Sequence, residues 1–341
     1  MGVHLTPVIT KRILHLEDLK GKSLAVDANN YLYQFLSLIR LPDGTPLKDS
    51  LGNVTSHLSG LMFRSTRLIR DYNIKLIFVF DGIPPKLKQL EILKRRRSRE
   101  KATREYEEAL KAQDYAMAFS KAVMTSRLTK PLIQDAKHLL ELLGIPYVQA
   151  PSEAEAQAAY MAMKGDVWAA SSKDYDALLF GASRLLRYLT IYGREFLPSK
   201  GTSRALKPEL IELHEFLSYH GITREQLVDI AILIGTDFNK GVEGIGPKTA
   251  LKLIGKNERL ENLPSKIGSK IPENYEEIRA FFLNPETIGN YDLKYKELDE
   301  AGVYHFLCDQ RGFARKNVET IVERMEKFYQ DRKQAGLEKW L

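Results

Sequence analysis

Short apolar runs that end at an acidic residue recur along this chain of 341 residues. Ser23–Val26 ends at Asp27, and Leu76–Phe80 ends at Asp81. Each run has the length and continuity of a buried strand and is followed by a turn or a helix. Because ligands gather beyond the carboxyl ends of parallel strands in open α/β sheets, the pattern predicts such a sheet with acids along one edge. On its own stretch, however, Asp27 is better explained as the cap of the following helix.

The stretch from residue 150 to 181 carries two further pairs of acids, each spaced by one residue. Glu153 and Glu155 stand at a predicted helix start. Ser152 and Glu155 match a capping box, and capping by itself would be enough to explain the presence of Glu155. Asp174 and Asp176 follow an apolar run at residues 167–171, and in extended backbone they would face the same side. Two such carboxylates repel each other unless they are protonated or neutralised by a cation.

The segment from residue 86 to 104 is strongly basic. It holds nine Lys and Arg against two Glu, a net charge of +7 that equals the charge of the whole chain. Most charge runs are solvated helix faces, but two glutamates are too few to pair with nine cations. Phosphate binding is the better interpretation. On a helix, Lys88 and Arg95 would share one face.

A seventh acid, Asp237, follows an apolar helix predicted over residues 227–233. Soon after it, residues 244–248 read Gly-Ile-Gly-Pro-Lys and open another apolar helix. Glycines permit close backbone approach, proline suits a first helical turn, and amides at a helix start bind phosphate oxygens. This turn predicts a contact with a nucleic-acid backbone.

The available ligand chemistry indicates hard divalent cations. With one cysteine, Cys308, and seven scattered histidines, the chain offers no credible zinc cluster. Oxygen-only ligands suit Mg²⁺ or Mn²⁺. Two such ions would activate water and stabilise the leaving oxygen in phosphodiester hydrolysis. The alternative, that all seven acids are caps and surface charges, leaves Glu153, the Asp174/Asp176 pair and the basic segment unexplained together.

Five motifs, in this order, resemble the flap endonucleases of the XPG-type structure-specific 5′-nuclease family: VDANNYLYQFL, FVFDGIPPKLK, QAPSEAEAQAAY, SSKDYDALLFG and IGTDF…GIGPKTALKLI. The resemblance covers the chain from Gly2 to its C-terminal tail. It implies an α/β fold with a central, mostly parallel sheet flanked by helices, a helical arch and a helix-two-turn-helix DNA-binding element. It also implies cleavage at the base of a 5′ flap in Okazaki-fragment maturation and DNA repair, with 5′–3′ exonuclease activity on nicked or gapped DNA.

The same resemblance assigns roles to individual residues. It implies two Mg²⁺ ions, replaceable by Mn²⁺, held directly or through water by the seven acids: Asp27, Asp81, Glu153, Glu155, Asp174, Asp176 and Asp237. It implies that Lys88 and Arg95 act on the scissile phosphate. Contacts to DNA are expected from Gly2, Tyr33, Arg96, Arg97, Gly244, Gly246 and Lys248, with a monovalent cation such as K⁺ at the helix-two-turn-helix element. Without the resemblance, Tyr33 would be taken for an ordinary core aromatic.

The resemblance also implies the organisation of the chain. A single nuclease domain is expected over residues 1–326, with an N-terminal nuclease region at about 1–98, the arch at about 83–130 and an internal nuclease region at about 123–255. The remaining residues, 327–341, are expected to bind a sliding clamp (PCNA) through Gln334, Leu337, Trp340 and Leu341. Leu341 departs from the family pattern, which has an aromatic residue there.

The expected setting is the cytoplasm of an archaeal cell, or the nucleus if the source is eukaryotic, with the free protein a monomer. No run reaches the ~18 apolar residues that a membrane span needs, so no membrane partner is expected. Two alternatives remain open: a related 5′-exonuclease or bubble- or junction-cutting nuclease, and a non-catalytic adaptor that binds branched DNA and recruits the clamp.

Overall fold

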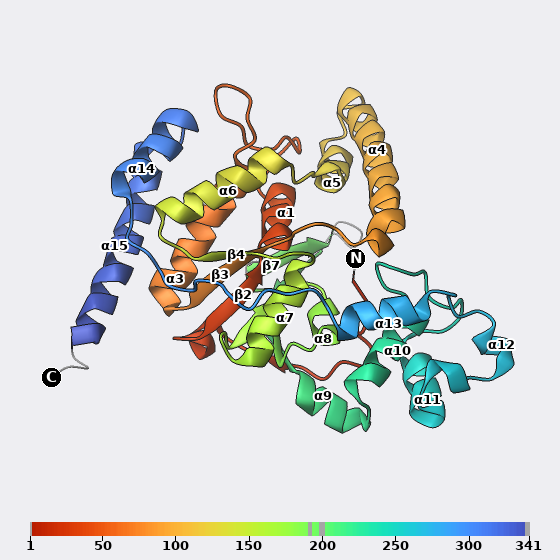
Figure 1. Cartoon of the computed structure of the whole chain (residues 1–341). Helices are drawn as coiled ribbons and strands as arrows, with labels where there is room; N and C mark the ends of the chain where they lie inside the picture. Colours follow the sequence, from red (N-terminus) through yellow and green to blue (C-terminus); the bar gives the residue numbers. More distant parts are fainter. Residues whose placement is uncertain (1, 190–192, 198–201, 338–341) are drawn as a thin grey trace.

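A seven-stranded sheet forms the centre of the computed structural model, which describes residues 2–189, 193–197 and 202–337 (Figure 1). The strand order is β1-β9-β6-β5-β2-β3-β4. The five strands from β6 to β4 are parallel, whereas β9 and β1 are antiparallel to their neighbours. The predicted mostly parallel sheet is therefore confirmed. The strands of this sheet are β1 Arg12–Ile13, β2 Ser23–Asp27, β3 Lys75–Phe80, β4 Tyr147–Gln149, β5 Ala169–Ser171, β6 Arg184–Arg187 and β9 Glu209–Glu212.

Helices cover both faces of this sheet (Figure 1). Alternate residues of one strand point to opposite faces, so on β2 Ala25 joins one hydrophobic core while Leu24 and Val26 join the other. The first core includes residues of α7 Ala154–Lys164, α8 Asp176–Leu179, α9 Leu213–His220, α10 Arg224–Ile234, α11 Pro247–Asn257 and α13 Tyr275–Leu283. The second includes residues of α1 Ala28–Leu38, α2 Ser56–Gly60, α3 Thr66–Tyr72, α6 Lys130–Leu142, α14 Glu300–Tyr304 and α15 Arg315–Leu337. Both faces of the sheet are thus withdrawn from water, as parallel sheets require.

The long helix α4 Gln89–Lys111 and the shorter helix α5 Tyr115–Thr125 project beside the sheet (Figure 1). Their buried side chains are all alanines, Ala102 and Ala109 on α4 and Ala118 and Ala122 on α5. Small side chains let two helix backbones approach closely, and an ion pair of 2.6 Å between Lys121 and Glu105 links them. This pair occupies the segment where the arch was expected.

The smaller elements include a second sheet and a short helix. Strands β7 Gly193–Leu197 and β8 Thr202–Leu206 form an antiparallel hairpin, and α12 Ser265–Gly268 is a single turn. None of the described helices is both long and apolar enough to cross a lipid bilayer.

The predicted clamp-binding tail, residues 327–341, begins within the C-terminal helix. Helix α15 continues through that position to Leu337, and Phe328 is buried in the second core. Gln334 is exposed near the helix end. The side chain of Leu337 and the whole of Trp340 and Leu341 lie outside the described residues.

Candidate active site

The sheet places four chain segments with acidic residues at its carboxyl edge. Asp27 is the last residue of β2, Asp81 follows β3, and Asp174 follows β5. Glu153 and Glu155 lie at the start of α7, which follows β4. The acids that follow the strands therefore lie together at this edge, as the repeated pattern of strand and acid predicted. Asp237 joins them from the loop after α10.

Asp27 combines the two roles that the sequence left as alternatives. It is the N-cap of α1, where its Oδ1 accepts a 2.9 Å hydrogen bond from the backbone N–H of Asn30. The side-chain amide of Asn30 also donates to Asp174 Oδ2 at 3.4 Å. The helix cap therefore belongs to the acidic cluster.

Asp81 is fixed by two donors. Its Oδ1 accepts from the backbone N–H of Ala154 at 2.8 Å, and its Oδ2 accepts from the Asn29 side chain at 2.7 Å. The first bond satisfies an otherwise free amide in the first turn of α7. Asp81 thus joins the loop after β3 to the helix that carries Glu155.

The expected capping box at the start of α7 is wrong. The N-cap is Glu153 rather than Ser152, and it makes no side-chain cap bond. Glu155 instead accepts a 2.6 Å hydrogen bond from Ser172 Oγ, next to the end of β5. The start of α7 has shifted by one residue, because Asp81 supplies the acceptor that a capping serine would have provided.

The extended backbone expected at Asp174 and Asp176 is also wrong. Tyr175 is the N-cap of α8 in helical conformation, and Asp176 is the first residue of that helix. The backbone N–H of Val3 donates to Asp176 Oδ1 at 2.8 Å. A Cβ at Gly2 would lie 2.5 Å from the same oxygen, so any larger residue there would have to displace the Asp176 carboxylate. Gly2, predicted to contact DNA, packs directly against the acidic cluster.

The acids raise one another's proton affinity because they are buried together. Burial, followed by the charges of Asp176 and Asp27, raises the pKa of Glu155 well above its ordinary value. Burial and the charge of Asp174 raise the pKa of Asp176 to about 7. Burial and the charge of Asp81 raise the pKa of Asp27. A set of like charges with raised pKa values is stabilised by bound positive charge.

Two cations of the basic segment partly supply that charge. Lys88 forms an ion pair with Glu153 and lies 3.9 Å from Asp237 Oδ2. Arg95 Nη2 lies 2.5 Å from the same oxygen of Asp237, and its Nε lies 3.0 Å from Glu91. Burial alone would lower the pKa of Lys88, but pairing with Glu153 outweighs it and raises that pKa. The lysine is therefore charged at the site, while burial still raises the pKa of Glu153.

The donor set fits divalent metal ions, although the side chains are not arranged around one. Among the described residues, no group of three His, Cys, Asp or Glu side chains has the geometry to hold a metal ion. The reason is local: Lys88, Asn29, Ser172 and the backbone amides already bind carboxylate oxygens. The seven carboxylates provide only oxygen ligands, the chemistry that Mg²⁺ and Mn²⁺ prefer.

The residues expected to contact DNA lie on exposed parts of this face and beyond it. Tyr33 of α1 is 39% exposed, so it is not the core residue that its helical spacing alone would suggest. Arg96 and Arg97 are exposed on α4. Gly244 and Gly246 are exposed in the turn between α10 and α11, where Gly244 has a φ of +80°, and Lys248 is exposed in the first turn of α11. Helix α11 begins at Pro247, as predicted.

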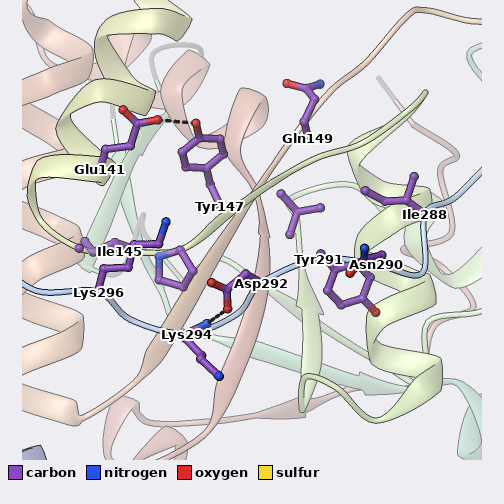
Figure 2. Close-up of a pocket in the computed structure, with 13 residues that line it drawn as sticks. Glu141, Ile145, Tyr147, Gln149, Ile288, Asn290, Tyr291, Asp292, Lys294 and Lys296 are labelled. Carbon is purple, nitrogen blue, oxygen red and sulfur yellow. Dashed lines mark hydrogen bonds between the residues drawn. The ribbon is translucent and has the colours of Figure 1, made fainter.

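A cavity of about 370 Å³ lies away from the acids, between the turn before β4 and the extended segment 288–296 (Figure 2). Figure 2 shows Glu141, Tyr147 and Gln149 on one side and Tyr291, Asp292 and Lys294 on the other. None of the predicted site residues lines it. The candidate site is therefore the open acidic edge of the sheet rather than this cavity.

The sequence analysis missed the polar residues that orient the acids, chiefly Asn29, Asn30 and Ser172. Each stands within three residues of a predicted ligand. A polar, hydrogen-bonding residue two or three positions from a predicted ligand was the signal that could have found them.

Two family models match most of the chain: the XPG N-terminal domain over residues 1–102 and the XPG I-region over residues 144–237. Flap endonuclease 1 of Hyperthermus butylicus is 48% identical over 100% of this chain and 99% of its own length. Flap endonuclease 1 of Pyrococcus abyssi is also 48% identical, over 100% of this chain and 98% of its own length. The chain belongs to the flap endonuclease family.

Solved structures agree with this assignment. Flap endonuclease-1 from Methanococcus jannaschii matches this flap endonuclease with a TM-score of 0.76 and 42% identity, covering 97% of this chain and 100% of that one. The catalytic core of Rad2 in complex with a DNA substrate matches with a TM-score of 0.70 and 22% identity, over 95% of this chain and 100% of that one, which shows a shared fold. The family is one of nucleases, so this member is a hydrolase that acts on DNA.

Proposed function

We propose that this chain is a structure-specific 5′ flap endonuclease that cuts branched DNA at the base of the flap, using divalent metal ions. The observation that carries the proposal is the convergence of seven acids at one sheet edge beside the basic helix α4. Full-length identity near 48% to proteins named flap endonuclease 1 supports the flap as substrate. Roles in Okazaki-fragment maturation and DNA repair, with 5′–3′ exonuclease action on nicked or gapped DNA, follow from the family.

The seven acids would hold two Mg²⁺ ions, with Mn²⁺ as a substitute. When bound, these ions would supply Lewis-acid activation of water and stabilisation of the leaving oxygen. The chain's own residues set up that chemistry: Asn29 and the Ala154 amide fix Asp81, Asn30 bridges Asp27 and Asp174, and Ser172 orients Glu155.

Lys88 and Arg95 would bind the scissile phosphate. Both side chains already reach into the acidic cluster, and Lys88 is only 18% exposed. A phosphate that enters the site offers them anionic oxygens in place of Glu153 and Asp237, so they can exchange partners while remaining charged. A fixed positive charge beside the developing negative charge lowers the barrier for phosphoryl transfer.

The remaining contacts belong to the same proposal. Tyr33, Arg96 and Arg97 would contact the strand near the cleavage site, with α4 and α5 as the arch around a single-stranded flap. Gly244, Gly246 and Lys248 would grip duplex DNA, with K⁺ at the helix-two-turn-helix element. Residues 334–341 would bind the sliding clamp, and the protein would act as a monomer in the cytoplasm of an archaeal cell.

The decisive experiment is cleavage of a 5′-flap substrate in Mg²⁺ and in EDTA, followed on a denaturing gel. We expect a cut at or one nucleotide from the junction in Mg²⁺ and none in EDTA. Asp174→Ala should retain DNA binding and lose cleavage, and wild-type turnover by that variant would remove Asp174 from the metal site. A nicked duplex and a bubble, run beside the flap, distinguish the related 5′-exonuclease and bubble nucleases. Branched-DNA binding with no cleavage of any substrate would favour the non-catalytic adaptor.

A further inference from the structure

Arg187 lies beside the loop that carries Asp174 and Asp176, although it contacts neither carboxylate through any described hydrogen bond. It is the last residue of β6. In the parallel pairing of β5 with β6, Ser171 stands opposite Leu186. The register therefore brings Arg187 to the point where the chain leaves β5 and enters this loop.

The guanidinium of Arg187 holds both residues that flank Asp174. Its Nε donates to the backbone carbonyl of Lys173 at 2.8 Å, and its Nη1 donates to the hydroxyl of Tyr175 at 2.5 Å. Its carbon Cζ also lies 3.9 Å from the centre of the Tyr175 ring. Asp174 is thus bracketed by two contacts to one rigid, planar group.

The guanidinium is itself fixed by its surroundings. Arg187 is 6% exposed, and it stands directly opposite Glu209 in the antiparallel pairing of β6 with β9. Its Nη1 lies 3.0 Å from Glu209, and its Nη2 donates to the hydroxyl of Tyr188 at 2.8 Å. A buried arginine with its donors satisfied in this way is held rigidly by the sheet. It therefore also fixes the groups to which it donates, here the Lys173 carbonyl and the Tyr175 hydroxyl.

The backbone next to Arg187 carries strain. Tyr188 has a φ of +61°, a left-handed conformation that is rare for an aromatic residue. Such a residue persists where the surrounding contacts over-determine it, and such positions gather at functional sites. The strained turn directs the Tyr188 hydroxyl back to Arg187.

We propose that Arg187 is a positioning residue that fixes the segment carrying Asp174 and Asp176, so that their carboxylates stay at the site where divalent metal ions would bind. This inference rests on the proposed function, because it presumes that these acids hold metal. Arg187 acts through the Lys173 carbonyl and the Tyr175 side chain. Groups that orient metal ligands commonly change metal affinity or activity by about 10- to 100-fold when they are replaced.

Arg184 offers a matched control on the same strand. It stands opposite Glu212 in the same pair of strands and forms an ion pair with it at 3.1 Å. Replacing either arginine with methionine removes one cross-strand arginine–glutamate pair. Only Arg187 contacts the loop of Asp174.

The test measures Mn²⁺ binding without DNA, by electron paramagnetic resonance, together with the kcat and KM of flap cleavage in Mg²⁺. For Arg187→Met we expect Mn²⁺ affinity to fall by about 10-fold or more, kcat to fall, and KM and flap binding in EDTA to stay within twofold. Raising Mg²⁺ should restore part of the lost kcat. Arg184→Met should bind Mn²⁺ and cleave like the wild type.

A second variant keeps the test decisive if Arg187→Met does not fold. Arg187→Lys retains a charge opposite Glu209 but cannot hold Lys173 and Tyr175 with one planar fork. We expect it to fold and to show the same loss of Mn²⁺ affinity, and wild-type affinity in this variant would overturn the proposal. If the wild type itself binds no Mn²⁺ and cuts no flap, the proposed function fails. If the wild type binds and cuts while both Arg187 variants match it, only the positioning role fails.

Discussion

Replacing Asp176 with asparagine should stabilise the protein in the absence of metal, and do so more strongly at pH 8 than at pH 5. The pKa of Asp176 is raised from its ordinary value of 3.8 to about 7, by burial first and by Asp174 second. A carboxyl with a raised folded-state pKa contributes stability that is complete below pH 3.8 and is lost as the pH rises through about 7. Asparagine has nearly the same shape, can accept the hydrogen bond from Val3, and does not titrate.

The size of the effect follows from the pKa. Near pH 5 to 6 the folded protein holds about one more proton at Asp176 than the unfolded chain, and at pH 7 about half a proton more, so the free energy of unfolding falls by up to about 1.4 kcal/mol per pH unit. The difference in free energy of unfolding between Asp176→Asn and the wild type should therefore increase by about 2 to 3 kcal/mol from pH 5 to pH 8. Taking the difference between two pH values removes any effect of the substitution that does not depend on protonation.

The assay is urea unfolding of wild type and variant in EDTA at both pH values. Asp331→Asn is the control, because Asp331 is exposed and should give no widening. If the variant exceeds the wild type in free energy of unfolding by the same amount at pH 5 and pH 8, the claim that buried like charges destabilise this site is refuted. Excess Mg²⁺ should also stabilise the wild type, by about 2.7 kcal/mol at a concentration 100 times the Kd, and Asp176→Asn much less.

Three further predictions concern residues around the site and in the core. Arg95→Ala should slow single-turnover flap cleavage by about 100-fold with little change in flap binding. Replacing the exposed Arg96 should reduce that rate far less, and an equal reduction in rate for both variants would argue against a specific role for Arg95. Lys248→Ala should weaken duplex binding uniformly across sequences and reduce the salt slope by about one, and an unchanged slope in a filter-binding titration would remove Lys248 from the phosphate contacts. His57 is fully buried and burial lowers its pKa to about 4. The free energy of unfolding should therefore fall by about 3 kcal/mol as the pH drops from 6.5 to 4. In urea unfolding, His57→Phe should make this pH dependence less steep, and an equally steep dependence in the variant would contradict the assignment.

The parallel centre of the sheet was predictable because its strands are continuous apolar runs. Strands β2 and β3 lie close to the expected ranges, and both faces of each are buried. The antiparallel edge was not predicted. Strand β1 has only two residues, both exposed, and β9 has four, so neither carries a strong hydrophobic pattern. Strand β9 pairs with the edge of β6, and β1 pairs in turn with β9.

The acids of the site were predictable as a set, whereas their local conformations were not. Glu155 matched a capping box on spacing alone, but Asp81 satisfies the helix start from another strand. Asp174 and Asp176 matched an extended pair, but α8 begins at Asp176. In both cases a contact from a distant segment outweighed the local preference, and a local pattern carries no information about such contacts.

The same contacts determine which acid gives the clearest test of chemistry. Asp27 caps α1, Asp81 satisfies the first turn of α7, and Asp176 accepts the Val3 amide, so replacing any of them removes a structural hydrogen bond along with a charge. The one described bond to the carboxylate of Asp174 is a 3.4 Å contact from Asn30, which contributes little. Loss of cleavage in Asp174→Ala with unchanged unfolding in EDTA would therefore report on catalysis alone. A fall in stability comparable to that of Asp27→Ala would show instead that Asp174 supports the fold.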